Sequence, residues 1–264
     1  MHTDNSFDGN YSATDMCESA IANGLSTISF TDHFDVDFFK AHNLAARQEN
    51  SYNDTCAVKE KYKDKIDLLV GIELGQPTYD EMLTEKSLNK YSYDFVIGSI
   101  HNPRSQPDYG DFNYSEMELD EVYRMLDNYF EEMLLLAKWN GFDTLAHLTY
   151  PLRYIMGNHG VKVELERYSE IIDEILTTLV KNGKALEINT SGLRQKIGLT
   201  MPTVDYVRRF RELGGEYLTL GSDAHFTEHV GAGIEQGYDI ALEAGFEYVT
   251  YFKNRKPVKV KIEK

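Results

Sequence analysis

The chain has 264 residues and a formal net charge of −16, from 27 lysines and arginines against 43 aspartates and glutamates. Its hydrophobic content of 42% and charged content of 27% are ordinary for a globular protein, which excludes a disordered chain and a fibre. The negative charge repels polyanions, so we expect no nucleic-acid partner. No stretch approaches the roughly 18 consecutive apolar residues of a membrane span, so we expect no membrane partner either.

The two cysteines are too few for a disulfide framework in a chain of this length. The first ten residues are polar and acidic and do not resemble a signal peptide. Both observations favour the reducing cytoplasm as the location. The sequence leaves the oligomeric state open.

In chain order, short β-rich runs alternate with amphipathic helical runs. The first helix is expected at residues 13–24 with its end at Gly24, and the first strand at 28–33. Residues 36–65 are expected to mix loop and helix. Further strands are expected at 67–75, 94–101, 143–148, 185–191, 217–225 and 247–252, with a possible edge strand in the tail from residue 257. Further helices are expected at 78–90, 116–140, 165–182, 203–213 and 237–244.

This alternation predicts a parallel sheet, because a parallel strand pair needs a crossover that is usually a helix. About seven such units favour a barrel over an open sheet. No linker and no change of composition divides the chain. We therefore expect one α/β domain over residues 1–264.

Polar side chains gather at the ends of the predicted strands. They are His33, Glu73, His101, His147, Asp223 and His225. In a barrel of parallel strands these ends lie on one face, where active sites are built. A single histidine there is more often a structural residue than a ligand, but independent structural residues have no reason to collect at equivalent strand ends. Imidazole together with carboxylate matches Zn, Mn or Fe better than Mg or Ca, so we expect a metal centre.

Several motifs resemble, in order, those of the polymerase-and-histidinol-phosphatase (PHP) superfamily. They are His2-Thr3, Ser6-Phe7-Asp8-Gly9, Thr31-Asp32-His33, Gly71-Ile72-Glu73, Gly98-Ser99-Ile100-His101, Ala146-His147 and Ser222-Asp223-Ala224-His225. The size of the chain is similar to that of the monofunctional histidinol-phosphatase branch. The resemblance implies a distorted (β/α)7 TIM-like barrel with three divalent metal ions (Zn, Mn or Fe) at the C-terminal face of the strands.

The resemblance also implies a ligand set for each ion. The first ion takes His2, Glu73 and Asp223, the second Glu73, His101 and His147, and the third Asp8, His33 and His225. Glu73 then bridges two ions. The family's first motif is His-x-His, and Met1 occupies its middle position. We therefore expect the first histidine and the opening strand to be missing, through an internally assigned start or the loss of a ligand.

The activity that the resemblance implies is metal-dependent hydrolysis of a phosphomonoester, with L-histidinol phosphate of histidine biosynthesis as the first choice. Clustered metal ions lower the pKa of water and hold the phosphoryl oxygens, and Glu73 and Asp223 belong to this catalytic centre. The phosphate also needs a cationic clamp, for which Arg153 and Arg194 are best placed after their strands.

Two alternatives remain at this point. The substrate could be a nucleotide, an oligonucleotide end or a phosphotyrosine peptide, although the net charge weakens the polynucleotide version. The chain could also be a non-catalytic metal-binding module. The residues that recognise the leaving alcohol are expected in loops such as 34–62 and 102–115, where the sequence offers no readable pattern.

Overall fold

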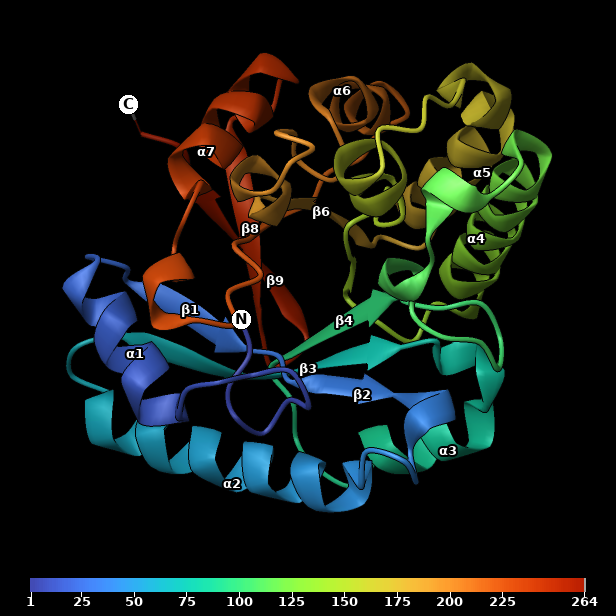
Figure 1. Cartoon of the computed structure of the whole chain (residues 1–264). Coiled ribbons are helices and arrows are strands. Elements are labelled where there is room, and N and C mark those ends of the chain that lie inside the picture. The colour runs from blue at the N-terminus through green and yellow to red at the C-terminus, as the bar shows by residue number, and fades with distance from the viewer. Residues whose placement is uncertain (264) are drawn as a thin grey trace.

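A curled, parallel β-sheet forms the centre of the computed structural model, which describes residues 1–263, and helices pack along its outside (Figure 1). The strands of this sheet are β1 (Thr27–Phe30), β2 (His33–Asp35), β3 (Asp67–Gly75), β4 (Phe95–Ser99), β5 (Thr144–Leu145), β6 (Ala185–Asn189) and β7 (Leu218–Gly221). They lie in the order β1-β3-β4-β5-β6-β7, and β2 also pairs with β3. All of these pairs are parallel, as the alternation of the sequence predicts.

The crossover helices lie where the sequence predicts them, within a few residues at each end, except that the helix at 44–62 lies in the stretch 36–65, which is expected only to mix loop and helix. They are α1 (Ala13–Ala22), α2 (Leu44–Tyr62), α3 (Glu81–Leu88), α4 (Leu119–Trp139), α5 (Ser169–Lys181), α6 (Val204–Glu212) and α7 (Ile234–Glu243). In α4 the fully buried side chains of Val122, Leu126, Tyr129 and Met133 recur at helical spacing and join the main core. The helices therefore cover the sheet with their apolar faces.

The predicted strand at 28–33 is divided in two, and the division places polar groups at the site. After β1 ends, Asp32 accepts hydrogen bonds from the backbone N–H of Thr3 (2.5 Å) and from the hydroxyls of Ser6 (3.1 Å) and Ser51 (2.6 Å). The backbone N–H of Thr31 donates to the carbonyl of Met1 at this point (2.9 Å). β2 then resumes beside β3, with His33 in register with Glu73.

The predicted strand at 247–252 is present, but it does not join the parallel sheet. It forms β8 (Tyr248–Lys253), which pairs antiparallel with β9 (Lys256–Lys261) in a separate two-stranded sheet. Asn254 and Arg255 both have positive φ (51° and 62°), the geometry of a tight hairpin turn. The turn is held by Asp94, which accepts from the N–H of Asn254 (3.0 Å). The tail strand is thus confirmed, and the parallel pairing of 247–252 is wrong.

The parallel sheet stays open between β1 and β7. A cavity of about 240 Å³ lies there, lined by side chains of both strands and of β8. Met1 reaches one end of this gap, where its carbonyl accepts from the N–H of Thr31 (2.9 Å), and the N–H of His2 donates to the carbonyl of Ala224 (2.9 Å).

Within residues 1–263, the helices are all too short or too polar to cross a lipid bilayer.

Candidate metal centre

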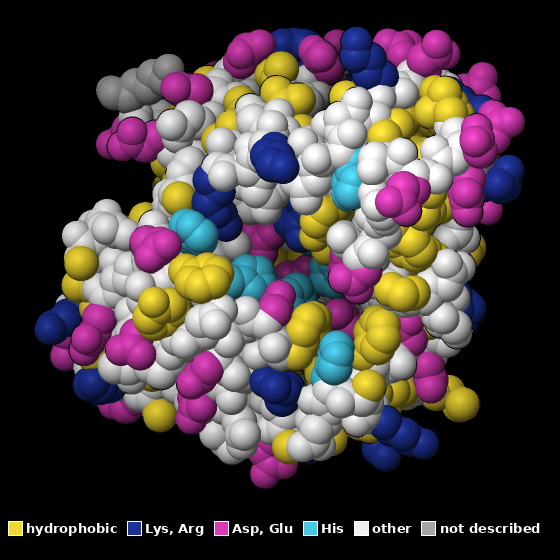
Figure 2. All heavy atoms as spheres, viewed as in Figure 1, with side chains coloured by type: hydrophobic (Ala, Val, Ile, Leu, Met, Phe, Trp, Pro, Cys, Tyr) yellow, Lys and Arg dark blue, Asp and Glu magenta, His cyan; other side chains and the backbone are white. Residues whose placement is uncertain are grey.

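The polar residues at the strand ends meet at one place on the molecule. Figure 2 shows histidine side chains on the floor of a hollow, with acidic and basic side chains beside them. The residues come from the N-terminal segment, the start of β2, the middle of β3 and the segments that follow β4, β5 and β7. Parallel pairing accounts for part of this convergence, because it brings the segments after β4, β5 and β7 to one edge of the sheet, and the register of β2 with β3 places His33 beside Glu73.

Glu73 lies at the centre of the group. Its Oε1 is 3.0 Å from Nε2 of His101 and 3.3 Å from Nε2 of His147, and its Oε2 is 3.5 Å from Nε2 of His2. The side chain is 5% exposed, so water does not solvate this carboxylate. Nδ1 of His33 lies 3.9 Å from the same Oε2, so one carboxylate faces four imidazoles, an arrangement suited to bridging two cations.

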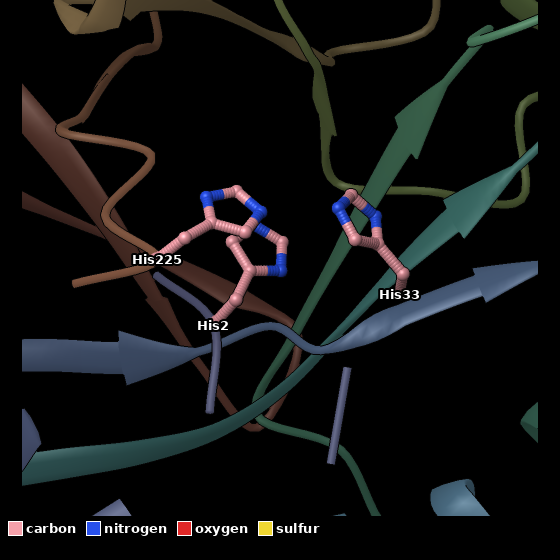
Figure 3. Close-up of side chains that lie close together, drawn as sticks. All are labelled: His2, His33 and His225. Atoms are coloured by element: carbon pink, nitrogen blue, oxygen red, sulfur yellow. The ribbon is translucent and has the colours of Figure 1, made fainter. Parts of the chain in front are cut away.

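A second group of imidazoles stacks beside it. The ring of His2 lies between those of His33 and His225, with centroid separations of 4.2 Å on both sides. Figure 3 shows these three side chains approaching from different segments of the chain. Asp8 closes this group at the surface, with its Oδ2 3.0 Å from Nε2 of His225 and 3.7 Å from Nε2 of His33.

Asp223 joins the two groups. Its Oδ1 is 3.3 Å from Nε2 of His2 and 3.7 Å from Nδ1 of His225. The backbone of Asp223 has a positive φ of 49°, which an L-residue adopts at a cost and which is typical of functional sites. Arg194 supports this conformation, since its Nη1 and Nη2 donate to the carbonyls of Ser222 and Asp223, both at 2.7 Å.

The electrostatics of the centre favour ionised carboxylates, whereas the pKa shifts of the imidazoles differ in direction: those of His2 and His147 are lowered, and that of His225 is raised by Asp8 and Asp223 despite burial. Burial opposes the ionisation of Glu73 and Asp223, but the surrounding histidines hold the pKa of both well below the usual range. Burial and the neighbouring His33 lower the pKa of His2 to about 4. Burial also lowers the pKa of His147. Neutral imidazole and ionised carboxylate are the forms that bind metal ions.

His101 differs because a second carboxylate holds it. Its Nδ1 is 3.1 Å from Oδ1 of the buried Asp35, while its Nε2 faces Glu73. Burial disfavours a charge on His101, but Asp35 and Glu73 outweigh this and raise its pKa well above the usual value. A carboxylate on the far nitrogen fixes the ring and is the usual outer support of a metal-ligating histidine.

These residues fit divalent metal ions. Three groups of donor atoms each lie within 4.8 Å of one another: His2 with His33 and His225, His33 with Asp35 and His101, and Glu73 with His101 and His147. Nδ1 of His33 is buried and has no hydrogen-bond partner in the described part of the chain. Buried carboxylates without cations are costly. The mixed imidazole and carboxylate donors suit Zn, Mn or Fe.

The structure therefore brings together all eight residues that the sequence proposes as metal ligands. The third donor group matches the predicted second ligand set residue for residue. The group of His2, His33 and His225 cuts across the predicted first and third sets, because the ring of His2 stacks on both other rings. The group of His33, Asp35 and His101 joins members of the third and second sets through Asp35, which the sequence does not propose as a ligand. The assignment of ligands to individual ions stays a prediction.

The two candidate clamp arginines lie differently. Arg153 has its guanidinium 4.2 Å above the ring of Tyr150, with Nη1 3.9 Å from Oδ2 of Asp223, and its buried Nε has no hydrogen-bond partner among residues 1–263. Its Nη2 donates to the hydroxyl of Tyr154, so Nε and Nη1 are the groups that remain to donate to an anion. Arg194 already uses both terminal nitrogens on backbone carbonyls. Arg194 is thus better placed to hold the loop after β7 than to clamp a phosphate.

Three carboxylates that the sequence reasoning missed support the centre. They are Asp32, Asp35 and Glu187. Asp35 follows His33 by two residues, and strand alternation could have placed both on one face. Glu187 interrupts the apolar run of β6 as Glu73 interrupts that of β3. A carboxylate inside an apolar strand therefore could have identified Glu187 as it identified Glu73. Its Oε2 accepts from the N–H of His147 (2.9 Å), and burial raises its pKa to about 8.

A curled parallel α/β sheet whose strand ends carry clustered histidines and carboxylates defines a protein of the metal-dependent barrel class. Residues 1–191 match the PHP domain, and the chain belongs to this family. The resemblance seen in the sequence motifs is thereby confirmed.

The most similar relatives include several histidinol-phosphatases. The chain is 31% identical to the probable histidinol-phosphatase of Thermotoga maritima, over 99% of this chain and 97% of the relative. It is 27% identical to the histidinol-phosphatase of Lactococcus lactis subsp. lactis, over 91% and 90% of the two chains.

Solved structures agree with the observed fold. A crystal structure of histidinol phosphate phosphatase from Lactococcus lactis subsp. lactis, complexed with zinc, L-histidinol and phosphate, superposes with a TM-score of 0.77 at 25% identity, covering 98% of this chain and 97% of that one. The putative histidinol phosphatase of Listeria monocytogenes gives a TM-score of 0.70 at 19% identity, covering 89% and 97%, and supports the fold alone. The TIM-like fold class predicted from the sequence is confirmed.

Proposed function

We propose that this chain is a metal-dependent phosphomonoester hydrolase that converts L-histidinol phosphate to L-histidinol and phosphate in histidine biosynthesis. The observation that carries the proposal is the buried cluster around Glu73, where carboxylates and imidazoles from six segments of the chain converge. The histidinol-phosphatase names of full-length relatives support this substrate.

The chain's own residues would prepare the centre for the reaction. Eight side chains would hold three divalent ions, namely His2, Asp8, His33, Glu73, His101, His147, Asp223 and His225. When bound, such ions supply Lewis acidity and lower the pKa of water enough for attack on phosphorus. The low pKa of His2 keeps its imidazole neutral at physiological pH, and Asp35 fixes the ring of His101.

Arg153 would orient the phosphate. Its guanidinium is held against Tyr150, so little side-chain entropy is lost when it binds an anion. Burial lowers the pKa of Arg153, but the neighbouring Tyr150, Tyr154 and Asp223 outweigh this and raise it, so the group stays charged throughout the physiological range. Arg194 would act through the backbone of Asp223, which it holds in place.

A nucleotide or a phosphotyrosine peptide is the alternative substrate, and a non-catalytic metal-binding module is the alternative function. The net charge of −16 supports a small substrate with a cationic part over a polynucleotide. A guanidinium beside the centre suits any of these phosphomonoesters and is not required by a non-catalytic metal-binding module, so it supports the hydrolase.

The test compares kcat/KM for L-histidinol phosphate, 3′- and 5′-nucleotides and phosphotyrosine, each with Mn, Zn or Fe. We expect histidinol phosphate to exceed every other ester by at least about tenfold, equivalent to about 1.4 kcal/mol of transition-state stabilisation. A kcat/KM for a nucleotide that exceeds that for histidinol phosphate by tenfold would overturn the proposed substrate, and the assignment as a metal-dependent phosphomonoester hydrolase would stand. Metal binding without turnover of any ester would leave only the non-catalytic module.

A further inference from the structure

Asp108 lies beside the metal centre, in the loop after β4, and has no ionic partner. None of the ion pairs among residues 1–263 involves it, although its side chain is partly buried. The only groups that donate to its oxygens within hydrogen-bond distance are neutral: the N–H of Gly110 (2.6 Å to Oδ1) and the hydroxyl of Tyr150 (3.1 and 2.9 Å to the two oxygens). An unpaired, partly desolvated carboxylate is costly unless a cation joins it.

The loop holds Asp108 close to the candidate metal ligands. The N–H of Tyr109 donates to the carbonyl of His101 (2.9 Å), which closes the loop directly beside Asp108. The ring of Tyr150, whose hydroxyl reaches Asp108, lies 5.2 Å from the ring of His101 and 4.9 Å from that of His147. One tyrosine ring therefore separates the carboxylate from the centre.

A directional chain of hydrogen bonds joins Asp108 to the candidate phosphate clamp. Arg153 can only donate, so the oxygen of Tyr154 accepts from its Nη2. The hydroxyl of Tyr154 then donates to that of Tyr150 (3.1 Å), and Tyr150 donates to Asp108. This order of donors and acceptors fixes the cation of Arg153 at one end of the hydrogen-bond chain and the anion of Asp108 at the other.

The two ends match the two charges of the proposed substrate. In L-histidinol phosphate, two carbons and one oxygen separate the ammonium nitrogen from phosphorus, so the two charges lie a few ångströms apart. Burial raises the pKa of Asp108, a cost that a bound ammonium would offset. We propose that Asp108 binds the ammonium group of the substrate and selects amino alcohol phosphates, an inference that rests on the proposed function.

The experiment measures kcat/KM for L-histidinol phosphate and for its analogue without the amine, 3-(imidazol-4-yl)propyl phosphate, with wild-type protein and the Asp108→Asn variant. Asparagine keeps an oxygen that accepts from Gly110 and Tyr150 but removes the charge. We expect the wild type to prefer the amine and the variant to lose about 10–100-fold of that preference, the range of a charge-assisted hydrogen bond. Asp111→Asn, at an exposed position in the same loop, is the matched control and keeps the preference.

A merely structural role of Asp108 would lower kcat/KM for both esters equally and leave their ratio unchanged, which would overturn the proposal. Where Asp108→Asn fails to fold, Asp108→Ser keeps an acceptor for the N–H of Gly110 and is measured instead, with the same expected loss of preference. A wild-type protein that shows no preference for the amine would also overturn the ammonium site, whereas the proposed substrate fails only if a nucleotide or phosphotyrosine exceeds histidinol phosphate. The two failures are therefore distinguishable.

Discussion

At the scale of single residues, Glu73 lies within ion-pair distance of four imidazoles of the metal centre, those of His2, His33, His101 and His147. Both of its carboxylate oxygens face imidazoles, which come from the N-terminal segment, from β2 and from the segments after β4 and β5. Those imidazoles keep it ionised despite its burial. Removing this side chain should therefore affect more than one ion, whereas removing a single histidine should affect one.

We predict that Glu73→Ala binds at least one equivalent of metal less than the wild type and loses about 10³-fold or more of its turnover. That loss exceeds the roughly 10–100-fold typical of a residue that only supports a ligand. Elemental analysis of the purified protein and phosphate release measure the two effects. Glu85→Ala, at an exposed position of α3, is the control. A Glu73→Ala protein with full metal content would exclude the bridging role.

At the scale of elements, the short strand β2 contributes both a candidate metal ligand, His33, and a carboxylate that supports another ligand, Asp35. His33 and Asp35 lie two residues apart and so point to the same side of the strand. His33 faces Asp8 and Glu73, while Asp35 reaches Nδ1 of His101 from the neighbouring part of the sheet. The parallel register of β2 with β3 fixes both contacts at once.

We predict that Asp35→Asn weakens metal binding or activity by about 10–100-fold, because His101 loses the carboxylate that orients its ring. The pKa of His101 should also fall, since Asp35 is the largest of the influences that raise it. Proton NMR titration of the metal-free protein follows this pKa. Asp37→Asn, in the following turn, is the matched control because Asp37 contacts Asn102 and Gln76 instead of His101. An unchanged pKa of His101 in Asp35→Asn would contradict the assigned contact.

At the scale of the whole molecule, the buried Glu187 links the metal centre to the interior of the sheet. Its carboxylate lies between β6 and β7, and a Cβ on Gly221 would come within 2.1 Å of its Oε1. Glycine at 221 therefore allows this close approach. Burial raises the pKa of Glu187 to about 8, with the nearby Glu73 adding to the shift.

This shift predicts how the stability of the metal-free protein depends on pH. A folded-state pKa raised above the ordinary value of 4.5 means that the contribution of Glu187 to stability is fully present below pH 4.5 and is lost as pH rises to about 8. Glu187→Gln keeps the side chain neutral at every pH. We therefore expect it to raise Tm by several degrees at pH 8.5 and by less at pH 5.5.

Thermal unfolding of the metal-free wild type and variant measures this difference. Glu116→Gln, at an exposed position after β4, is the control and should change Tm similarly at both pH values. An equal effect of Glu187→Gln at the two pH values would show that the carboxyl is ionised in the folded state.

Local patterns were sufficient for much of the fold and for the candidate ligands. Apolar residues at helical spacing predict helices such as α4, because one face of such a helix must be buried. Strands such as β3 read as continuous apolar runs, because a parallel sheet is covered on both faces. A polar residue that ends or interrupts such a run must be stabilised, which is why His33, Glu73 and His101 could be found without a structure.

Tertiary structure alone decided the contacts between segments far apart in the chain. The sequence determines the elements and the residue types at their ends through short-range burial patterns. It does not show that β8 turns back on β9 instead of joining the parallel sheet, since an Asn-Arg turn carries no strong hairpin signal. Nor does it show that Asp35 supports His101, that Arg194 holds the loop at Asp223, or that Tyr150 ties Asp108 to the centre. Each of these depends on distances across the fold, which burial patterns along the chain do not encode.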